Sequence, residues 1–344
     1  MTDTNSTTPT TIATMEAVAQ HGYGGVEVLS IRRLPVPAPK PAEVLVRVHA
    51  VSPDSGTVHL MKGDPLVVRP VIGLKTPRQP IIGLAFAGVV ETVGTEVSGF
   101  AVGDRVAGSA PAAFAEYVVA SPAKIARIPD GVSMTDAATL PISAGTALQA
   151  VRDAARVQPG QRVLIIGAGG GVGSFMVQLA ATEGARVTGM ASAAKAEFVR
   201  SLGAENVIDY RANTEPHDWG TFDVIIDAAD GRALHVLRRA LTDRGTLVIV
   251  GADKAGGPLL RGADRQLRAV MLDPWVRHRL TAVVQRESGD DVALLLGMLA
   301  EGRLRAPVND TAPVSGAREL IDRLAQQLTR GKAVIELRAE VARA

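Results

Sequence analysis

Cysteine is absent from the 344-residue sequence. Its absence excludes disulfide bonds, thiol nucleophiles and every metal site built on thiolates. Aromatic residues make up only 3% of the chain, which argues against the stacking platforms that bind single-stranded nucleic acid. Basic and acidic residues number 37 and 35 and leave a net charge of +2, so a general polyanion-binding surface is not expected. We therefore expect no nucleic-acid partner.

Long hydrophobic runs are also missing. The longest apolar stretch, from Pro80 to Val90, stops at Glu91 and is far shorter than the roughly 20 residues of a membrane-spanning helix. Residues 1–14 are polar and rich in threonine, without the basic start and apolar middle of a secretory signal, and they read as a disordered tail. We expect no membrane partner. The lack of cysteine fits a reducing compartment, so the predicted location is cytoplasmic.

The length suits two domains, and the pattern of expected secondary structure changes once along the sequence. Up to about residue 121, short β-rich runs are broken by glycine and proline, which predicts a mostly β domain with strands at 43–49, 88–94, 103–108 and 116–120. Beyond 129–131, apolar strands alternate with helices, which predicts a parallel sheet covered on both faces.

This second part opens with a helix that Ser133 is expected to cap. After residue 251 the pattern is less regular, and we predict a strand at 267–272, a helix at 290–300 and a final strand at 332–337. The alternating elements before it are strands at 162–166, 185–189, 206–210, 222–227 and 245–250, with helices at 172–183, 193–202 and 231–241.

A glycine-rich turn is the most informative motif. It follows a predicted strand and leads into an amphipathic helix, which is the context that identifies a dinucleotide-binding loop. A tight turn without side chains lets the backbone approach a ligand closely, and the free amides at the helix start favour a pyrophosphate. The spacing departs from strict G-x-G-x-x-G. The predicted cofactor-binding residues here are Gly167, Ala168, Gly169, Gly170, Gly171, Val172 and Gly173.

The choice between NADPH and NADH depends on the end of the next strand. An acidic residue about 20 positions after the loop normally binds the adenosine ribose hydroxyl, yet here the strand ends in Ala191 and Ser192. A missing carboxylate removes repulsion against a 2′-phosphate, and Lys195 is available to pair with one. Ser192 and Lys195 are therefore predicted to bind NADPH, with NADH less favoured. The alternative is that Lys195 is a solvated helix residue.

Several motifs in family order resemble the medium-chain dehydrogenase/reductase superfamily, in its zinc-free quinone oxidoreductase (zeta-crystallin-like) branch. They cover nearly the whole chain. The matching segments are residues 21–29, 41–48, 88–94, 103–106, 140–148, the glycine loop, 202–210 and 331–335.

This resemblance implies an α/β fold with two domains. A GroES-like β domain is expected to comprise residues 15–128 and 285–344, and a Rossmann doubly wound parallel sheet of residues 129–284 is expected to be inserted within it. The cleft between them is expected to hold nicotinamide and substrate. A homodimer formed through a sheet edge is implied in the same way.

Zinc alcohol dehydrogenases of this superfamily use cysteine and a Gly-His-Glu segment. Here the corresponding segment reads Gly83-Leu84-Ala85, no cysteine exists, and the six histidines are scattered without ligand spacing. We therefore expect no metal. Without zinc, ordinary carbonyl–alcohol exchange lacks its electrophile, whereas quinones and α,β-unsaturated carbonyls delocalise the charge that arrives with hydride. These are the expected substrates.

Candidate catalytic residues come from the family's substrate loop. Asp54 stands where the family usually has Asn, and Thr57 stands where it usually has Asp. A carboxylate accepts hydrogen bonds and donates one only when protonated, so the role of Asp54 beside nicotinamide is open. A solvated turn Asp is the alternative. Thr57 and His59 are candidates to donate to a substrate oxygen. No proton donor stands out, and water is the default source.

The remaining cofactor contacts are also implied by the resemblance. Thr146 matches a Thr near nicotinamide, Tyr210 a Tyr near the adenosine phosphate, and Lys332 a basic position near the cofactor. Gly251 ends a strand where bare backbone is expected to face nicotinamide. The segment 61–80 is expected to shape the substrate mouth.

The sequence thus predicts a zinc-independent, NADPH-dependent reductase of quinones or enones. Two alternatives stay open. One is an NAD(P)-dependent alcohol dehydrogenase or carbonyl reductase, which should contain metal. The other is a protein that binds NADPH without turnover.

Overall fold

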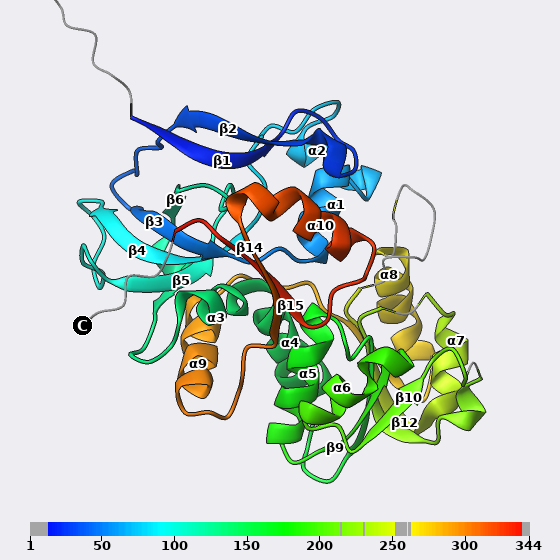
Figure 1. The fold of residues 1–344 in the computed structure, drawn as a ribbon. Coiled ribbons are helices and arrows are strands. Elements are labelled where there is room, and N and C mark those ends of the chain that lie inside the picture. The colour runs from blue at the N-terminus through cyan, green and yellow to red at the C-terminus, as the bar shows by residue number, and fades with distance from the viewer. Residues whose placement is uncertain (1–12, 214, 230, 252–259, 261–262, 339–344) are drawn as a thin grey trace, which may run out of the picture.

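The computed structural model describes residues 13–213, 215–229, 231–251, 260 and 263–338. Most of the predicted tail, residues 1–12, lies outside this range. Thr14, its last residue, already begins strand β1. Figure 1 shows the β-rich part of the molecule, in blue and cyan, above the parallel sheet, in green and yellow, with the C-terminal strands in orange and red returning to the β-rich part.

The β-rich part combines the first third of the chain with its end. A hairpin of β1 (Thr14–Gln20) and β2 (Leu29–Pro35) lies beside a seven-stranded sheet, and β3 is the strand on which β4, β6 and β15 all pair. The strands of the large sheet are β3 (Val44–Val51), β4 (Ala85–Val93), β5 (Arg105–Ser109), β6 (Tyr117–Ala120), β7 (Ile125–Arg127), β14 (Val308–Pro313) and β15 (Lys332–Glu336).

The core of this sheet explains why distant segments join it. Phe86 of β4 and Ile335 of β15 are fully buried in one apolar cluster, although 249 positions separate them in the sequence. Burial of such side chains stabilises by about 1.5–3 kcal/mol each. The helices of this part include α1 (Ser55–Lys62), α2 (Arg69–Ile72) and α10 (Ala317–Ala325).

The parallel sheet has the strand order β10-β9-β8-β11-β12-β13, with every neighbouring pair parallel. This is the doubly wound order in which the chain leaves the centre twice, once in each direction. Its strands are β8 (Arg162–Ile166), β9 (Arg186–Ala191), β10 (Asn206–Asp209), β11 (Phe222–Asp227), β12 (Leu241–Ile249) and β13 (Arg279–Ala282).

Both faces of this sheet are buried, as the near-continuous apolar strands predicted. Val163 and Ile165 of β8 join one core cluster, while Leu164 and Ile166 join another on the opposite face. The accompanying helices are α5 (Gly171–Thr182), α6 (Ala196–Ser201), α7 (Leu234–Leu237) and α8 (Ala263–Leu272). The fold class predicted from the sequence is thereby confirmed.

A long helical run links the two parts of the molecule. It comprises α3 (Met134–Ala138), α4 (Gly145–Leu148) and two π-helical stretches at 140–144 and 149–155. Ser133 caps it as predicted, with its hydroxyl accepting from the amide of Asp136 at 3.0 Å.

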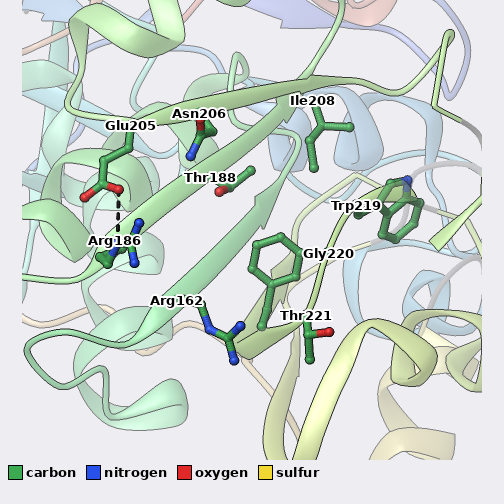
Figure 2. Close-up of a pocket in the computed structure, with 10 residues that line it drawn as sticks. Arg162, Arg186, Thr188, Glu205, Asn206, Ile208, Trp219, Gly220 and Thr221 are labelled. Atoms are coloured by element: carbon green, nitrogen blue, oxygen red, sulfur yellow. Dashed lines mark hydrogen bonds and ion pairs between the residues drawn. The ribbon is translucent and has the colours of Figure 1, made fainter. Parts of the chain in front are cut away.

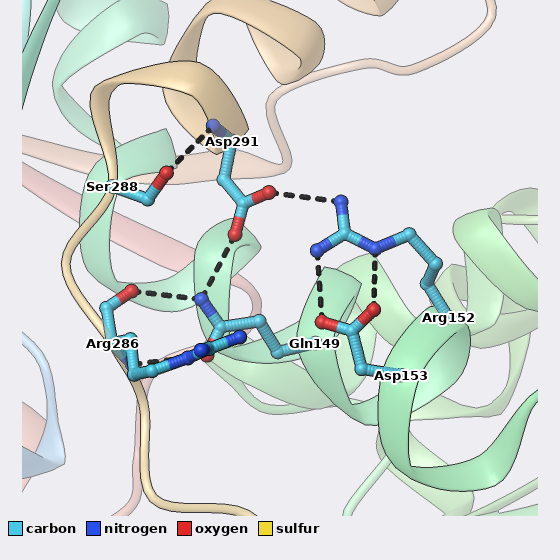
Figure 3. Close-up of polar contacts among 6 residues, drawn as sticks. All are labelled: Gln149, Arg152, Asp153, Arg286, Ser288 and Asp291. Atoms are coloured by element: carbon cyan, nitrogen blue, oxygen red, sulfur yellow. Dashed lines mark hydrogen bonds and ion pairs between the residues drawn. The ribbon is translucent and has the colours of Figure 1, made fainter.

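Polar contacts tie this run to the returning chain (Figure 3). The Gln149 amide donates to the Arg286 carbonyl at 2.7 Å and to Asp291 at 2.9 Å, and Arg152 donates to Asp291 at 2.8 Å. Asp291 belongs to α9 (Gly289–Ala300), which lies at the predicted helix 290–300. These bonds fix the segment through which the chain returns from the parallel sheet.

The strand predicted at 267–272 is wrong, because these residues form the end of helix α8. The run is apolar at five of its six positions, and short apolar runs do not distinguish strand from helix. In the helix, Arg265 and Ala269 face inward at i, i+4, whereas Leu267, Val270 and Met271 are exposed. The sixth strand of the sheet is β13 instead.

The helix predicted at 231–241 is shorter than expected. It begins at Leu234, ends in a 3₁₀ turn at Ala240, and gives way to β12 at Leu241. The predicted domain boundaries stay predictions.

Candidate cofactor and substrate site

The glycine loop joins β8 to α5 at the carboxyl edge of the parallel sheet. Gly167 has a φ of +83°, which favours glycine. A Cβ on Gly173 would lie 2.1 Å from the carbonyl oxygen of Gly167, so only glycine lets the helix start this close to the turn. The loop is therefore shaped by backbone approach rather than by side chains.

The start of α5 offers free donors. The Gly170 amide bonds to the carbonyl oxygen of Gly167, and that of Ser174 to Gly170. Within the described residues, the backbone amides of Gly171 and Val172 have no hydrogen-bond acceptor. Gly170 at the N-cap has no side chain to cap them. A helix N-terminus with unpaired amides favours an anion, and the loop fits the diphosphate of a dinucleotide.

Two cations lie beside this loop. The Lys195 stem packs on Gly169, where a Cβ would come 2.8 Å from its Cδ, and its ammonium donates to the Thr329 carbonyl at 2.7 Å. Burial, followed by the charge of Arg330, holds the pKa of Lys195 below its ordinary value. Two positively charged residues are therefore available on this side of the loop, which suits a dianionic phosphate.

The other predicted adenosine-side residues lie at the same edge. Ser192 directly follows β9, and Tyr210 follows β10 and is 41% exposed, with its amide bonded to the Ala191 carbonyl at 3.4 Å. Arg211 lies 5.6 Å above the Tyr210 ring. Gly251, which was predicted to face nicotinamide, follows the end of β12. These residues thus follow the carboxyl ends of β9, β10 and β12, at the edge of the sheet where the glycine loop lies.

Lys332 joins three segments of the cleft. It begins β15, is 2% exposed, and its ammonium donates to the Pro53 carbonyl at 2.9 Å and to the Ser143 hydroxyl at 2.8 Å. Its Cδ lies 3.2 Å from where a Cβ on Gly171 would stand. Burial lowers the pKa of Lys332 to about 8, against the opposing effect of Asp54.

Asp54 caps helix α1. Its Oδ1 accepts from the Thr57 amide at 2.8 Å and from the Thr57 hydroxyl at 3.1 Å, in a capping box. Its Oδ2 is buried and has no hydrogen-bond partner, although buried polar atoms are usually satisfied. Asp54 is thus not the solvated turn residue weighed as its alternative.

The remaining candidates differ in access. Thr57 is 1% exposed and its hydroxyl is bonded to Asp54, while His59, two residues further along α1, is half-buried. The Thr146 hydroxyl donates to the Ile142 carbonyl at 2.7 Å within its own helix. The roles predicted for these side chains stay predictions.

Comparisons with known proteins agree with this architecture. Residues 40–130 match the family described as alcohol dehydrogenase GroES-like domain, and residues 202–335 the family described as zinc-binding dehydrogenase. The mitochondrial NAD(P)H oxidoreductase RTN4IP1 of Mus musculus is 30% identical over 369 positions, covering 96% of this chain and 91% of that protein. The chain belongs to the medium-chain dehydrogenase/reductase superfamily.

Further relatives place it on the quinone oxidoreductase branch of that superfamily, as predicted. The chloroplast envelope quinone oxidoreductase homolog of Arabidopsis thaliana is 28% identical over 336 residues, covering 94% of this chain and 98% of that protein. The solved quinone oxidoreductase from Coxiella burnetii has a TM-score of 0.84 at 27% identity, covering 95% of this chain and all of the other.

A hollow of the molecule lies away from the glycine loop (Figure 2). It measures about 270 Å³, and Arg162 and Arg186, which begin β8 and β9, stand at its rim. It therefore opens at the amino edge of the sheet, opposite the glycine loop. Since open parallel sheets bind ligands at their carboxyl edge, this hollow is not the cofactor site.

Within the part of the chain that the structure describes, no group of three or more His, Asp or Glu side chains is arranged to hold a metal ion. No helix in that part combines the length and apolarity needed to cross a membrane. Zinc independence and a cytoplasmic location stay predictions, and the chloroplast and mitochondrial names of the relatives leave the compartment open.

Sequence reasoning missed three residues that shape this site. Ser143 accepts a hydrogen bond from Lys332, and the charge of Arg330 acts on Lys195, each from a remote part of the chain. Asp227, at the end of β11, accepts from the Ala229 amide at 3.1 Å and pairs with buried Arg265 at 2.8 Å, and it thereby orients the turn that packs on Gly167. In the sequence, the one signal for Arg330 is its position directly before Gly331 and Lys332, which belong to a motif of the family.

Proposed function

We propose that the protein is a zinc-independent, NADPH-dependent reductase of quinones or α,β-unsaturated carbonyls. The observation that carries this proposal is the glycine loop, whose amides at the start of α5 are unpaired and which has Lys195 beside it. Arg330 adds positive charge, and the end of β9 carries no acidic residue. The printed names of the quinone oxidoreductase relatives support the acceptor class.

The preference for NADPH follows from charge. Ser192 at the end of β9 offers a hydroxyl, and Lys195 and Arg330 offer positive charge, whereas the carboxylate that suits an unphosphorylated ribose is missing. Charge-assisted contacts to a 2′-phosphate contribute about 1.5–3 kcal/mol each. Tyr210 and Gly251 complete the adenosine and nicotinamide sides of this proposed site.

The chain's own residues then orient an acceptor that needs little activation. A bound nicotinamide supplies hydride. His59 is the accessible donor on α1 for the acceptor oxygen, Thr57 holds Asp54 in place, and Thr146 lies on the helical run beside the cleft. Because quinones and enones delocalise the incoming charge, orientation and exclusion of water are sufficient roles for the protein.

The reaction is tested by following NADPH oxidation against a panel of quinones and enones, with and without a chelator. We expect turnover with members of the panel that chelation leaves unchanged. Replacement of His59 by Ala should lower kcat/KM, and Arg200→Ala, on the exposed face of α6, serves as the control. Turnover confined to alcohols and lost on chelation would instead favour the alcohol dehydrogenase alternative, and binding without any turnover the non-catalytic one.

We also propose a homodimer formed along β13. This strand is at the edge of the parallel sheet, where its outer backbone N–H and C=O groups can pair with a further strand. Val284, two residues after this strand, is 80% exposed, and Trp275, four residues before it, is 85% exposed. Apolar side chains beside an open sheet edge fit a second copy of the same chain.

A further inference from the structure

Segment 66–78, which follows α1 at the surface, carries four exposed apolar side chains within nine residues. Leu66 and Val67 lie in a 3₁₀ turn, Val71 lies in α2, and Leu74 comes two residues after that helix. Val71 is 73% exposed and Leu74 69%, while Val67 is 49% and Leu66 37% exposed. Single exposed apolar side chains are ordinary, but several gathered in one short segment mark an interaction surface.

Contacts with the rest of the protein hold this segment in a defined shape. The Tyr23 hydroxyl donates to the Gly73 carbonyl at 2.7 Å, and the Arg69 guanidinium lies 4.6 Å from the centre of the Tyr23 ring. The Arg78 guanidinium donates to the Val71 carbonyl at 3.1 Å. In Figure 1, α2 lies beside the hairpin of β1 and β2. The exposed side chains therefore belong to a structured surface.

Positive charge is concentrated in the same stretch of chain. Residues 61–80 contain four basic side chains and one acidic side chain, which gives a net charge of +3, although the whole chain carries only +2. The other 324 residues together therefore have a net charge of −1. The four basic residues are Lys62, Arg69, Lys75 and Arg78, and the acidic one is Asp64.

Two of these cations lie at the apolar side chains. Lys75 is exposed and directly follows Leu74. Arg78 is also exposed, and its hydrogen bond to the Val71 carbonyl places its guanidinium beside the residue with the most exposed of the four apolar side chains. Segment 66–78 thus presents apolar groups and positive charge together.

This combination fits a lipid surface better than a second protein. Apolar side chains that enter the boundary between headgroups and acyl chains, with basic residues against anionic headgroups, are the features of a segment that lies on a membrane. A stable protein interface uses about 20–30 residues on each side, whereas segment 66–78 has thirteen. The edge strand β13, where we propose the dimer, belongs to the other sheet.

We propose that segment 66–78 docks on an anionic lipid surface, with its apolar side chains in the headgroup region and with Lys75 and Arg78 against the anionic headgroups. The expectation of no membrane partner came from the lack of a spanning segment, and a contact along the surface needs none. Docking does not depend on the proposed reaction. It brings α1, which directly precedes the segment, close to the lipid.

Vesicle binding by the full chain tests the proposal. The protein is sedimented with vesicles of phosphatidylcholine alone, or with one quarter of that lipid replaced by phosphatidylglycerol, at salt concentrations of about 0.05 M and about 0.5 M. At low salt we expect partitioning onto the anionic vesicles to be about 10-fold stronger than onto the neutral ones. At high salt this advantage should disappear. The comparison uses the wild type and needs no variant to fold.

A variant with a matched control places the contact on this segment. Val71→Asp replaces an apolar group by a charge that anionic headgroups repel, so it should weaken partitioning onto anionic vesicles by about 10-fold. Val102→Asp, between β4 and β5, adds the same charge at a side chain that is 68% exposed, and it should bind as the wild type does. Thermal unfolding at the wild-type temperature would show that both variants are folded.

Equal partitioning of the wild type onto both kinds of vesicle at low salt, or no binding to either, would overturn the proposal. Equal weakening by Val71→Asp and Val102→Asp would do so as well, because the effect would then come from charge alone. If the wild type does not bind vesicles and Val71→Asp instead lowers its molar mass in light scattering, the segment contacts a second copy of the chain and the lipid proposal is wrong.

Discussion

We expect the choice between NADPH and NADH to depend most on Lys195. We expect Lys195→Ala to weaken NADPH by about 10- to 100-fold, the equivalent of one charge-assisted phosphate contact, and to change NADH by less than 3-fold. Dissociation constants from cofactor fluorescence would measure this, with Arg200→Ala on the neighbouring helix as the control. Equal wild-type affinities for the two cofactors would contradict the NADPH assignment.

Lys332 makes a separate prediction for stability. Its pKa is about 8 in the folded chain and 10.5 in the ordinary state, so between these values the unfolded chain binds more protons and stability rises with pH. From pH 7 to 9.5 the wild type should gain about 2 kcal/mol of unfolding free energy relative to Lys332→Met. Urea denaturation of both proteins at the two pH values would measure it, and a constant difference between them would refute the assigned burial of this charge.

Single residues also mark the limit of prediction from sequence. The glycine loop, Ser192 and Lys195 follow from local spacing, because a strand, a turn and a helix start are adjacent in the chain. The contact of Lys332 with Pro53 and Ser143 joins positions 279 and 189 residues apart, and no local pattern encodes it. The unsatisfied Oδ2 of Asp54 likewise emerges only after folding.

At the scale of elements, the turn between β8 and α5 is closely constrained by its backbone. A Cβ at Gly173 would come 2.1 Å from a backbone oxygen, whereas at Gly170 the nearest heavy atom would lie 3.4 Å away. Gly173→Ala should therefore lower the unfolding free energy by about 1–3 kcal/mol through displaced backbone. Gly170→Ala, as the matched control, should fold as the wild type does. Equal stability of the two variants by chemical denaturation would show that the close approach is not required.

Secondary-structure elements could be predicted where the pattern of apolar residues and the length of the run indicated the same kind of element. The strands of the parallel sheet are buried on both faces and read as continuous apolar runs, so β8, β9, β10, β11 and β12 were expected close to their observed positions. Helix α8 was mistaken for a strand because its inward residues include Arg265, whose buried partner Asp227 lies on β11. A charged side chain that faces the core is assigned to the exposed face when elements are predicted from the spacing of apolar residues.

At the scale of the whole molecule, the open edge at β13 predicts the assembly state. We expect the protein to be a dimer by light scattering, and Val284→Asp to shift it toward monomer, since a buried carboxylate at the joined edge is unfavourable. Leu328→Asp, also exposed but far along the chain on the β-rich part, is the control. A monomeric wild type at micromolar concentration would remove the dimer proposal and leave the cofactor site untouched.

We propose that the backbone of residues 167–173 binds a dinucleotide diphosphate, with Lys195 on one side and Lys332 on the other. A crystal structure of the NADPH complex tests it most directly. We predict diphosphate density at the amides of Gly171 and Val172, with the 2′-phosphate beside Lys195 and the nicotinamide toward Asp54. Diphosphate density away from that turn, at the hollow beside Arg162 or elsewhere, would contradict the account.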